Sequence, residues 1–304
     1  MLVFFLVVFF DSISNQYRAK KLKICLCTLG KNENKYIKEF VEHYKNYGID
    51  KIFLYDNNDV EGEKFEEIIM EYIKDGFVEI KNWRGIEKAQ FKIMNDCYKT
   101  NSNKFDWLIF YDLDEFIHLK YFNSLKVFLS QTKFDKCSKI ELNWINFIDD
   151  GNSFFYDNRP LHIRFNKKEL NIYKKDFYPQ IKSIIRGYIS NLNIGCIHKL
   201  SSISTSCDGF GRISKTIGIK TMNPDYKKNY IKHYYGKSLQ EFVEKIKNGC
   251  AAKGKTNITM LAKIDRYFEI YKIEEKKIDY IENETGLDLS KYRAKKNNIY
   301  NNII

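Results

Sequence analysis

Two alternating patterns of apolar residues run through the first half of the chain. Four short apolar runs have the length and composition of buried strands: 21–29, 51–56, 77–83 and 106–116. Three longer segments between them repeat apolar residues at helical spacing: 34–48, 63–76 and 86–99. Buried strands that alternate with amphipathic helices predict a mostly parallel sheet covered by helices on both faces, which is an α/β fold.

The pattern changes after Glu115. Residues 139–152 look like a strand that runs into an acidic turn, and 152–229 are rich in short strands and loops. Ser238 and Glu241 form a capping box at the start of an amphipathic helix, and further helices follow at 260–271 and 273–283. We therefore predict three parts: an apolar N-terminal segment (1–20), one Rossmann-like domain (21–250) and a helical C-terminal extension (251–304).

The first ten residues, MLVFFLVVFF, are strongly apolar. They are too few to cross a bilayer, which takes roughly 20 residues. They also lack the basic start and the small-residue cleavage site of a signal peptide. A membrane-dipping anchor, a truncated anchor, a misplaced start and an extra buried strand all remain open for this segment.

Charge and cysteine content narrow the class of protein. The 304 residues carry a net charge of +12, which favours an anionic partner or a membrane surface, although a solvated lysine-rich surface explains it equally well. The lysines are spread along the chain, which argues against nucleic acid as a partner. Seven cysteines without a CxxC pair predict reduced, buried thiols. We therefore expect a cytoplasmic protein, with peripheral attachment to the cytoplasmic face of a membrane as one option.

Polar loops follow each predicted strand. In parallel sheets, ligands bind at the carboxyl ends of the strands. The loops at these ends read TLGKNEN, DNNDVEG, NWRG and DLDEF. They place one set of polar residues along a single rim of the sheet: Asn32, Glu33, Asp56, Asn57 and residues 112–115.

The fourth strand ends in three carboxylates, on Asp112, Asp114 and Glu115. Acids beside a buried strand must be hydrated, paired or bound to a cation. Carboxylates at positions i and i+2 can aim at one site while Leu113 points into the core, and their hard oxygens suit Mg²⁺ or Mn²⁺. A plain aspartate-rich turn is the alternative.

Haloacid-dehalogenase phosphatases also carry a DxD after a strand, and there the first aspartate is a nucleophile. Their motif lies on the first strand of the fold. Here it follows the fourth strand, so a nucleotide-diphosphate site fits better.

Together, several stretches make the chain resemble the GT-A glycosyltransferases, and most closely the family-2-like and family-92-like group of cell-surface glycan enzymes. The likeness covers most of Leu22 to Gly249, in this order: 31–59, 106–116, 143–165, 182–186, 197–200 and 233–249. It implies a GT-A fold and transfer of a hexose from a nucleotide-diphosphate sugar, with a UDP-sugar favoured. It also implies a divalent cofactor (Mn²⁺ or Mg²⁺), inversion at the anomeric carbon and a glycan or lipid-linked acceptor.

The resemblance assigns roles to matched positions. Asp112 would contact the ribose or the metal, Asp114 would ligate the metal, and His233 would serve the metal or the diphosphate. Lys182 and Lys237 would neutralise phosphate. The nucleoside pocket would be lined by Thr28, Asn32, Glu33, Asp56 and Asn57, with Gln90 along its floor.

An inverting transfer needs a carboxylate that deprotonates the acceptor hydroxyl. Asp150 is the first choice and Asp149 the second, because both lie in the acidic turn after the next strand. A plain Asp-Asp-Gly turn explains them equally well. Residues 148–151 also lack the Phe-Gly-Ser type of turn found in many family-92-like members. A metal-dependent phosphatase or nucleotidyl hydrolase, and a non-catalytic sugar- or nucleic-acid-binding protein, remain as alternative functions.

Overall fold

The computed structural model describes residues 14–149, 153–169, 179–190, 192–194, 205–217, 219–249 and 254–301. The chain packs as two compact units. The first comprises Met1–Ile145 and Asp176–His233, and the second comprises Asn146–Lys175 and Tyr234–Ile304. The apolar residues 1–10 lie outside the described ranges. The predicted limits at residues 20 and 250 stay predictions.

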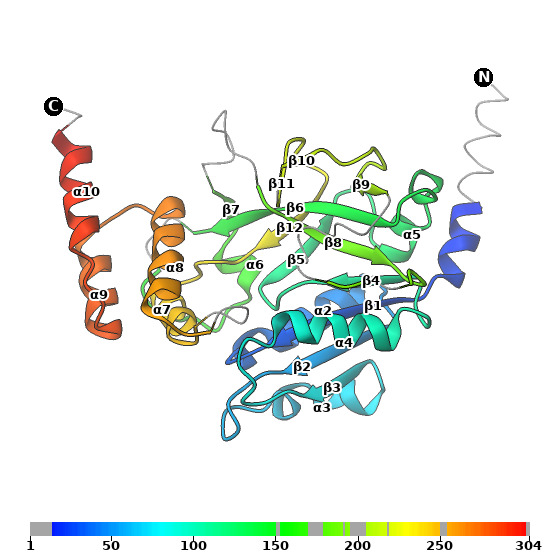
Figure 1. Cartoon of the computed structure of the whole chain (residues 1–304), viewed down its shortest axis with the longest axis horizontal. Helices are drawn as coiled ribbons and strands as arrows, with labels where there is room; N and C mark the ends of the chain where they lie inside the picture. Colours follow the sequence, from blue (N-terminus) through cyan, green and yellow to red (C-terminus); the bar gives the residue numbers. More distant parts are fainter. Residues whose placement is uncertain are drawn as a thin grey trace. The chain divides into compact units, whose positions relative to one another are not determined.

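One mixed sheet forms the centre of the first unit, with the strand order β3-β2-β1-β4-β8-β6-β12-β5 (Figure 1). Its strands are β1 (Ile24–Gly30), β2 (Lys51–Asp56), β3 (Val78–Asn82), β4 (Trp107–Phe110), β5 (Glu115–Leu119), β6 (Lys139–Ile148), β8 (Ile181–Arg186) and β12 (Asn229–His233), with β9 (Ser206–Asp208) beside β6. The strands β10 (Thr216–Ile217) and β11 (Lys220–Thr221) pair separately. The helices are α2 (Asn34–Asn46), α3 (Glu66–Lys74), α4 (Gln90–Asn101), α5 (Leu125–Leu129) and the 3₁₀ turn η1 (Thr132–Phe134).

Strands β1 to β4 are parallel, which confirms the predicted α/β fold class. Beyond β4 the sheet is more mixed than expected, since β8 runs antiparallel to both β4 and β6. The sequence accounts for this change. Parallel neighbours need a crossover that is usually a helix, and the amphipathic helical pattern stops before β8. The parallel half therefore sets the direction in which β1 to β4 present their carboxyl ends.

The predicted helices form with small changes of boundary. Helix α2 buries the expected face, and Gly48 after it adopts a φ of 76°, where glycine is favoured. In α3 the backbone at Ile69 departs from helical geometry, and within the apolar repeat Ile69 and Tyr72 are buried whereas Ile68 is 40% exposed. Helix α4 starts at Gln90, later than the predicted 86.

Helix α4 packs on the sheet over a buried cluster that includes Phe53, Tyr55 and Phe110. A disulfide between Cys27 on β1 and Cys97 on α4 joins the two layers. Cys25 stays a buried free thiol, and burial raises its pKa above the usual range.

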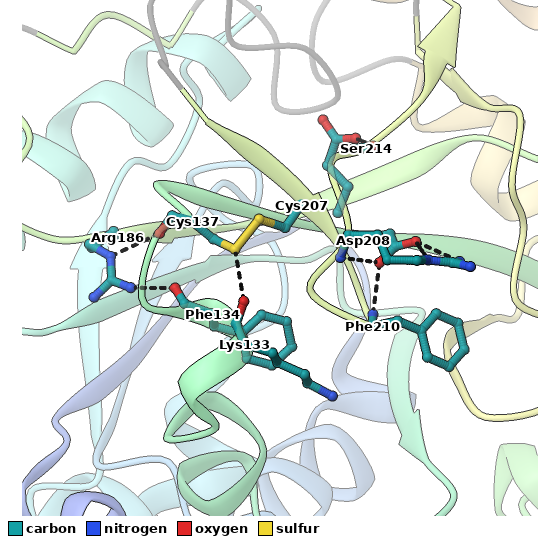
Figure 2. The surroundings of a disulfide bond; sticks show 10 residues. Lys133, Phe134, Cys137, Arg186, Cys207, Asp208, Phe210 and Ser214 are labelled. Carbon is teal, nitrogen blue, oxygen red and sulfur yellow. Dashed lines mark hydrogen bonds and ion pairs between the residues drawn. A yellow bond between two sulfur atoms is a disulfide. The ribbon is translucent and has the colours of Figure 1, made fainter.

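A second disulfide, Cys137–Cys207, lies where β9 pairs with the start of β6 (Figure 2). Arg186 donates to the carbonyls of Cys137 and Phe134 at 2.9 Å each, which secures the same corner. The prediction of reduced cysteines is therefore wrong for these two pairs. The two cysteines of each pair are 70 residues apart, so local spacing in the sequence could not predict either disulfide.

The second unit is mainly helical. It contains α6 (Leu161–Arg164), β7 (Lys167–Lys168), α7 (Leu239–Lys247), α8 (Asn257–Ile270), α9 (Glu275–Thr285) and α10 (Ser290–Asn301). The predicted capping box of Ser238 and Glu241 is confirmed at the start of α7. Glu241 also forms a buried bidentate ion pair with Arg164, at 2.8 and 2.9 Å. Among the described residues, no helix combines the length and the apolar content that crossing a bilayer requires.

Removing the Cys137–Cys207 disulfide should destabilise the first unit. Because the bond closes a loop of 70 residues, the Cys137→Ser/Cys207→Ser variant should lose about 2–4 kcal/mol of unfolding free energy. Urea denaturation without reductant measures this loss. Cys25→Ala serves as the control, since it alters a buried cysteine without removing a disulfide. Equal stability of the wild type and the double variant would show that the bond does not form.

Candidate functional site

The sheet brings the predicted polar loops to one edge. In the parallel ladder, Gly30 at the end of β1 pairs with Asp56 at the end of β2, which in turn pairs with Asn82 at the end of β3. Strand β4 lies on the other side of β1 and leads into Asp112. The residues predicted to line the donor pocket in the first unit therefore share the edge where α/β proteins bind ligands.

Close packing beneath this edge anchors the acidic motif through Leu113. Gly30 has no side chain, and an added Cβ would lie 2.5 Å from Leu113 and 2.6 Å from Phe65. Leu113 is fully buried. The predicted inward direction of Leu113 is thus confirmed.

The loop after β2 is held by Arg84, to which we assigned no role from the sequence. Its Nε donates to Asp56 Oδ2 at 2.8 Å, and its guanidinium also donates to carbonyls of residues 59–63. The Asn57 amide donates to the carbonyls of Trp83 and Ile86. Asp56 and Asn57 thus join the loops after β2 and β3. The sequence signal that could have identified Arg84 is its position in the polar NWRG loop, directly after β3.

The other predicted pocket residues differ in burial. Thr28 is buried, and its Oγ1 has no hydrogen-bond partner among the described residues. Asn32 is exposed with a φ of 56°, and its backbone N–H donates to Asn58 Oδ1 at 2.7 Å. Glu33 precedes α2, and Gln90 is half-exposed at the start of α4. Their roles in binding a nucleoside stay predictions.

The three carboxylates after β4 differ sharply in exposure. Asp114 and Glu115 are buried, whereas the Asp112 side chain is 36% exposed. The amine of Lys182, on β8, lies 2.6 Å from Asp112 Oδ2 and 3.0 Å from Glu115 Oε2. The backbone N–H of Asp112 also donates to Glu115 Oε2, at 3.0 Å. One lysine therefore connects two of the three acids.

Burial and charge act in opposite directions on this group. Burial raises the pKa of Glu115 to about 8, and the charges of Asp112 and Asp114 add to the rise while Lys182 opposes it. Burial alone would lower the pKa of Lys182, but the Asp112 and Glu115 carboxylates outweigh it and raise that pKa. Lys182 is therefore a permanent cation.

Asp114 lies beside the predicted histidine. His233, at the end of β12, has its Nε2 3.6 Å from Asp114 Oδ1, which permits an electrostatic interaction but is long for a direct hydrogen bond. The indole of Trp144 stacks on the His233 ring with centroids 4.2 Å apart. The structure thus brings Asp112, Asp114, Lys182 and His233 together within the first unit, and their roles in binding a metal or phosphate stay predictions.

The acidic cluster supplies part of the oxygen ligands that a hard divalent cation requires. Within the described residues, no three His, Cys, Asp or Glu side chains are arranged to hold a metal by themselves. Asp112 Oδ2 is bound to Lys182, while no hydrogen bond to its Oδ1 is found in the described part of the chain. Two carboxylates with further oxygens supplied by phosphate and water is the usual set for Mg²⁺ in nucleotide sites. The residues therefore fit an ion that arrives with a diphosphate.

The remaining predicted residues belong to the second unit or are not described. Asp149 is half-buried after β6, and its Oδ2 accepts the Ser153 N–H at 3.0 Å. Lys237 is buried with a φ of 52°, directly before the N-cap of α7. Asp150 lies outside the described residues.

Comparison with known proteins gives consistent matches. The model of glycosyltransferase family 92 matches residues 20–270. A family 92 protein of Ricinus communis is 30% identical over 102 residues, which is 33% of this chain and 18% of that protein. One of Arabidopsis thaliana is 28% identical over 110 residues, 36% of this chain and 19% of that protein. These matches thus span less than a fifth of either relative's length.

Solved structures resemble the chain more weakly. S. aureus TarS 1–349 in complex with UDP has a TM-score of 0.38 at 12% identity, covering 82% of this chain and 72% of that 1–349 chain. The mannosyltransferase PcManGT from Pyrobaculum calidifontis, in complex with GDP-Man and Mn²⁺, has a TM-score of 0.32 at 7% identity, covering 46% and 45%. Likeness of this degree carries no argument about the site.

The family match spans most of the described chain, including all four strand-end loops, the acidic one among them. The chain belongs to glycosyltransferase family 92.

Proposed function

We propose that this glycosyltransferase moves a hexose from a nucleotide-diphosphate sugar, in the first place a UDP-sugar, to a glycan or lipid-linked acceptor with inversion. The observation that carries the proposal is the acidic cluster after β4. Its exposed Asp112 and buried Asp114 lie beside Lys182 and His233, at the ligand-binding edge of the sheet.

Asp112 and Asp114 are the residues that would hold Mn²⁺ or Mg²⁺, with His233 next to Asp114. When bound, such an ion supplies positive charge that stabilises the departing nucleoside diphosphate. The side chains of this chain contribute position: Leu113 anchors the motif, and Lys182 holds Asp112 in one orientation. The stacked Trp144 limits the rotation of His233.

The nucleoside end of the donor would lie over β1 and β2. Thr28 offers a buried hydroxyl there, and Asn58 Nδ2 is a second buried donor without a hydrogen-bond partner in the described residues. Buried polar groups are costly when unpaired, so polar atoms of a ligand would compensate them. Arg84 keeps the neighbouring loop in place through Asp56.

The cellular location is a separate proposal. The net charge of +12 and the apolar residues 1–10 favour a membrane surface. The predicted cytoplasmic side is opposed by two disulfides, because such bonds form and persist mainly in oxidising compartments. We therefore favour an oxidising compartment.

A panel of nucleotide sugars, each with and without Mn²⁺, tests the function directly. We expect one donor to raise the melting temperature only when Mn²⁺ is present, since a bound ligand stabilises the folded state by mass action. The same donor should then label an added glycan or lipid acceptor. Release of inorganic phosphate from simple esters, without sugar transfer, would instead support the hydrolase alternative. Binding without turnover would support a non-catalytic protein.

Replacing Asp114 should remove catalysis while keeping the fold. Asp114→Asn retains the shape of the side chain but loses the charge that attracts a divalent ion, so kcat/KM should fall by about 100-fold or more. The Mn²⁺-dependent shift in melting temperature with UDP should also disappear. Asp106→Asn is the matched control, since Asp106 precedes β4 at the opposite end and accepts the Lys23 N–H. Equal losses in both variants would contradict the role of Asp114.

The acceptor base can be assigned by comparing Asp149→Asn with Asp150→Asn. Loss of the general base should lower kcat by about 10²–10⁴-fold, with little change in the Kd for the donor nucleotide. We expect this for one of the two variants. If both keep nearly full kcat, the base lies elsewhere and the acidic turn is structural.

A further inference from the structure

Lys182 is a cation built into the sheet behind the acidic cluster. Its strand, β8, pairs with β4 on one side and with β6 on the other. The side chain is 1% exposed and contacts two carboxylates, Asp112 at 2.6 Å and Glu115 at 3.0 Å. A lysine held this way cannot swing into solvent without leaving Glu115 buried and uncompensated, which is costly.

Asp112 forms the solvent-facing side of this arrangement. Its side chain is 36% exposed, compared with 0% for Glu115. One Asp112 oxygen is bound to Lys182, and no hydrogen bond to the other is found among the described residues. A cation from solvent would therefore reach Asp112 with the positive charge of Lys182 directly behind it.

The positive charge of Lys182 acts in opposite directions on the two groups that would bind here: it repels a divalent cation and attracts a diphosphate. The charge on Lys182 already neutralises part of the cluster and repels a second cation nearby. A diphosphate is attracted by Lys182 and by the incoming ion together. Its negative charge offsets the repulsion between Lys182 and the ion, so the ion should bind more tightly when the diphosphate is present.

We propose that Lys182 makes divalent-cation binding conditional on the nucleotide diphosphate, so that the free enzyme binds Mn²⁺ weakly and the nucleotide-bound enzyme binds it tightly. The inference rests on the proposed function, because it takes the acidic cluster as the donor's metal site. Lys182 acts here through Asp112 and is a positioning residue. The consequence is an order of binding in which the ion and the donor enter together.

Isothermal titration of Mn²⁺, alone and with saturating UDP, tests this proposal. In Lys182→Met, the Kd for Mn²⁺ alone should decrease by about tenfold, because a repelling charge close to the site is gone. The benefit that UDP gives to Mn²⁺ binding should shrink accordingly. Lys182→Arg keeps the charge and should restore the wild-type dependence on UDP.

Two further variants separate charge from loss of structure. Glu115→Gln removes one partner and leaves more of the charge of Lys182 unbalanced, so Mn²⁺ alone should bind more weakly than in the wild type. This direction is opposite to that of Lys182→Met, whereas structural damage would weaken binding in both. Lys139→Met is the matched control: Lys139 is also a buried lysine on the sheet, paired with Glu141, and its loss should leave the Kd for Mn²⁺ unchanged.

Circular dichroism first establishes that each variant is folded. If Lys182→Met does not fold, Lys182→Gln takes its place, because glutamine is uncharged but can still donate to Asp112, and it should likewise bind Mn²⁺ alone more tightly than the wild type. The proposal is overturned if the Kd for Mn²⁺ alone is unchanged or higher in folded Lys182→Met than in the wild type. A lower Kd for Mn²⁺ alone in Glu115→Gln would also overturn it. Failure of sugar transfer with every donor, alongside the expected Kd changes, would refute the proposed function and leave the role of Lys182 standing.

Discussion

The ion pairs of Lys182 with Asp112 and Glu115 are the interaction on which the site depends. Three carboxylates within four positions repel one another, and two of them are buried. A cation among them offsets this repulsion and the cost of burying charge at the end of β4. Lys182 provides that cation from β8, a strand that pairs antiparallel with β4.

This constraint explains the asymmetry of the cluster. Glu115 is sealed beneath the surface, and burial raises its pKa, so it serves the fold more than the ligand. Asp112 stays exposed, and Asp114 lies next to His233. This member of glycosyltransferase family 92 thus has an acidic motif that Lys182 holds in shape without a ligand. Under the proposed function, such preorganisation would lower the cost of orienting groups around a leaving diphosphate.

The parallel half of the fold followed from the sequence because its signals are local. Helical spacing in α2, the apolar runs of β1 to β4, and the Ser238–Glu241 capping box each depend on neighbours along the chain. The contacts that sequence reasoning missed are distant. Cys137 and Cys207 are 70 residues apart, Arg84 reaches back to Asp56, and the pairing of Lys182 with Glu115 needs the antiparallel register of β8. The acidic run predicted a cation nearby, but only the fold shows that the side chain of Lys182 is such a cation.

The most direct test of the account is a crystal structure of the enzyme with UDP and Mn²⁺, using anomalous scattering to locate the metal. The account predicts a manganese peak between the UDP diphosphate and the carboxylates of Asp112 and Asp114, with Lys182 still bound to Asp112. A diphosphate that contacts Lys182 directly with no metal at these aspartates, or a manganese ion bound elsewhere on the chain, would contradict it.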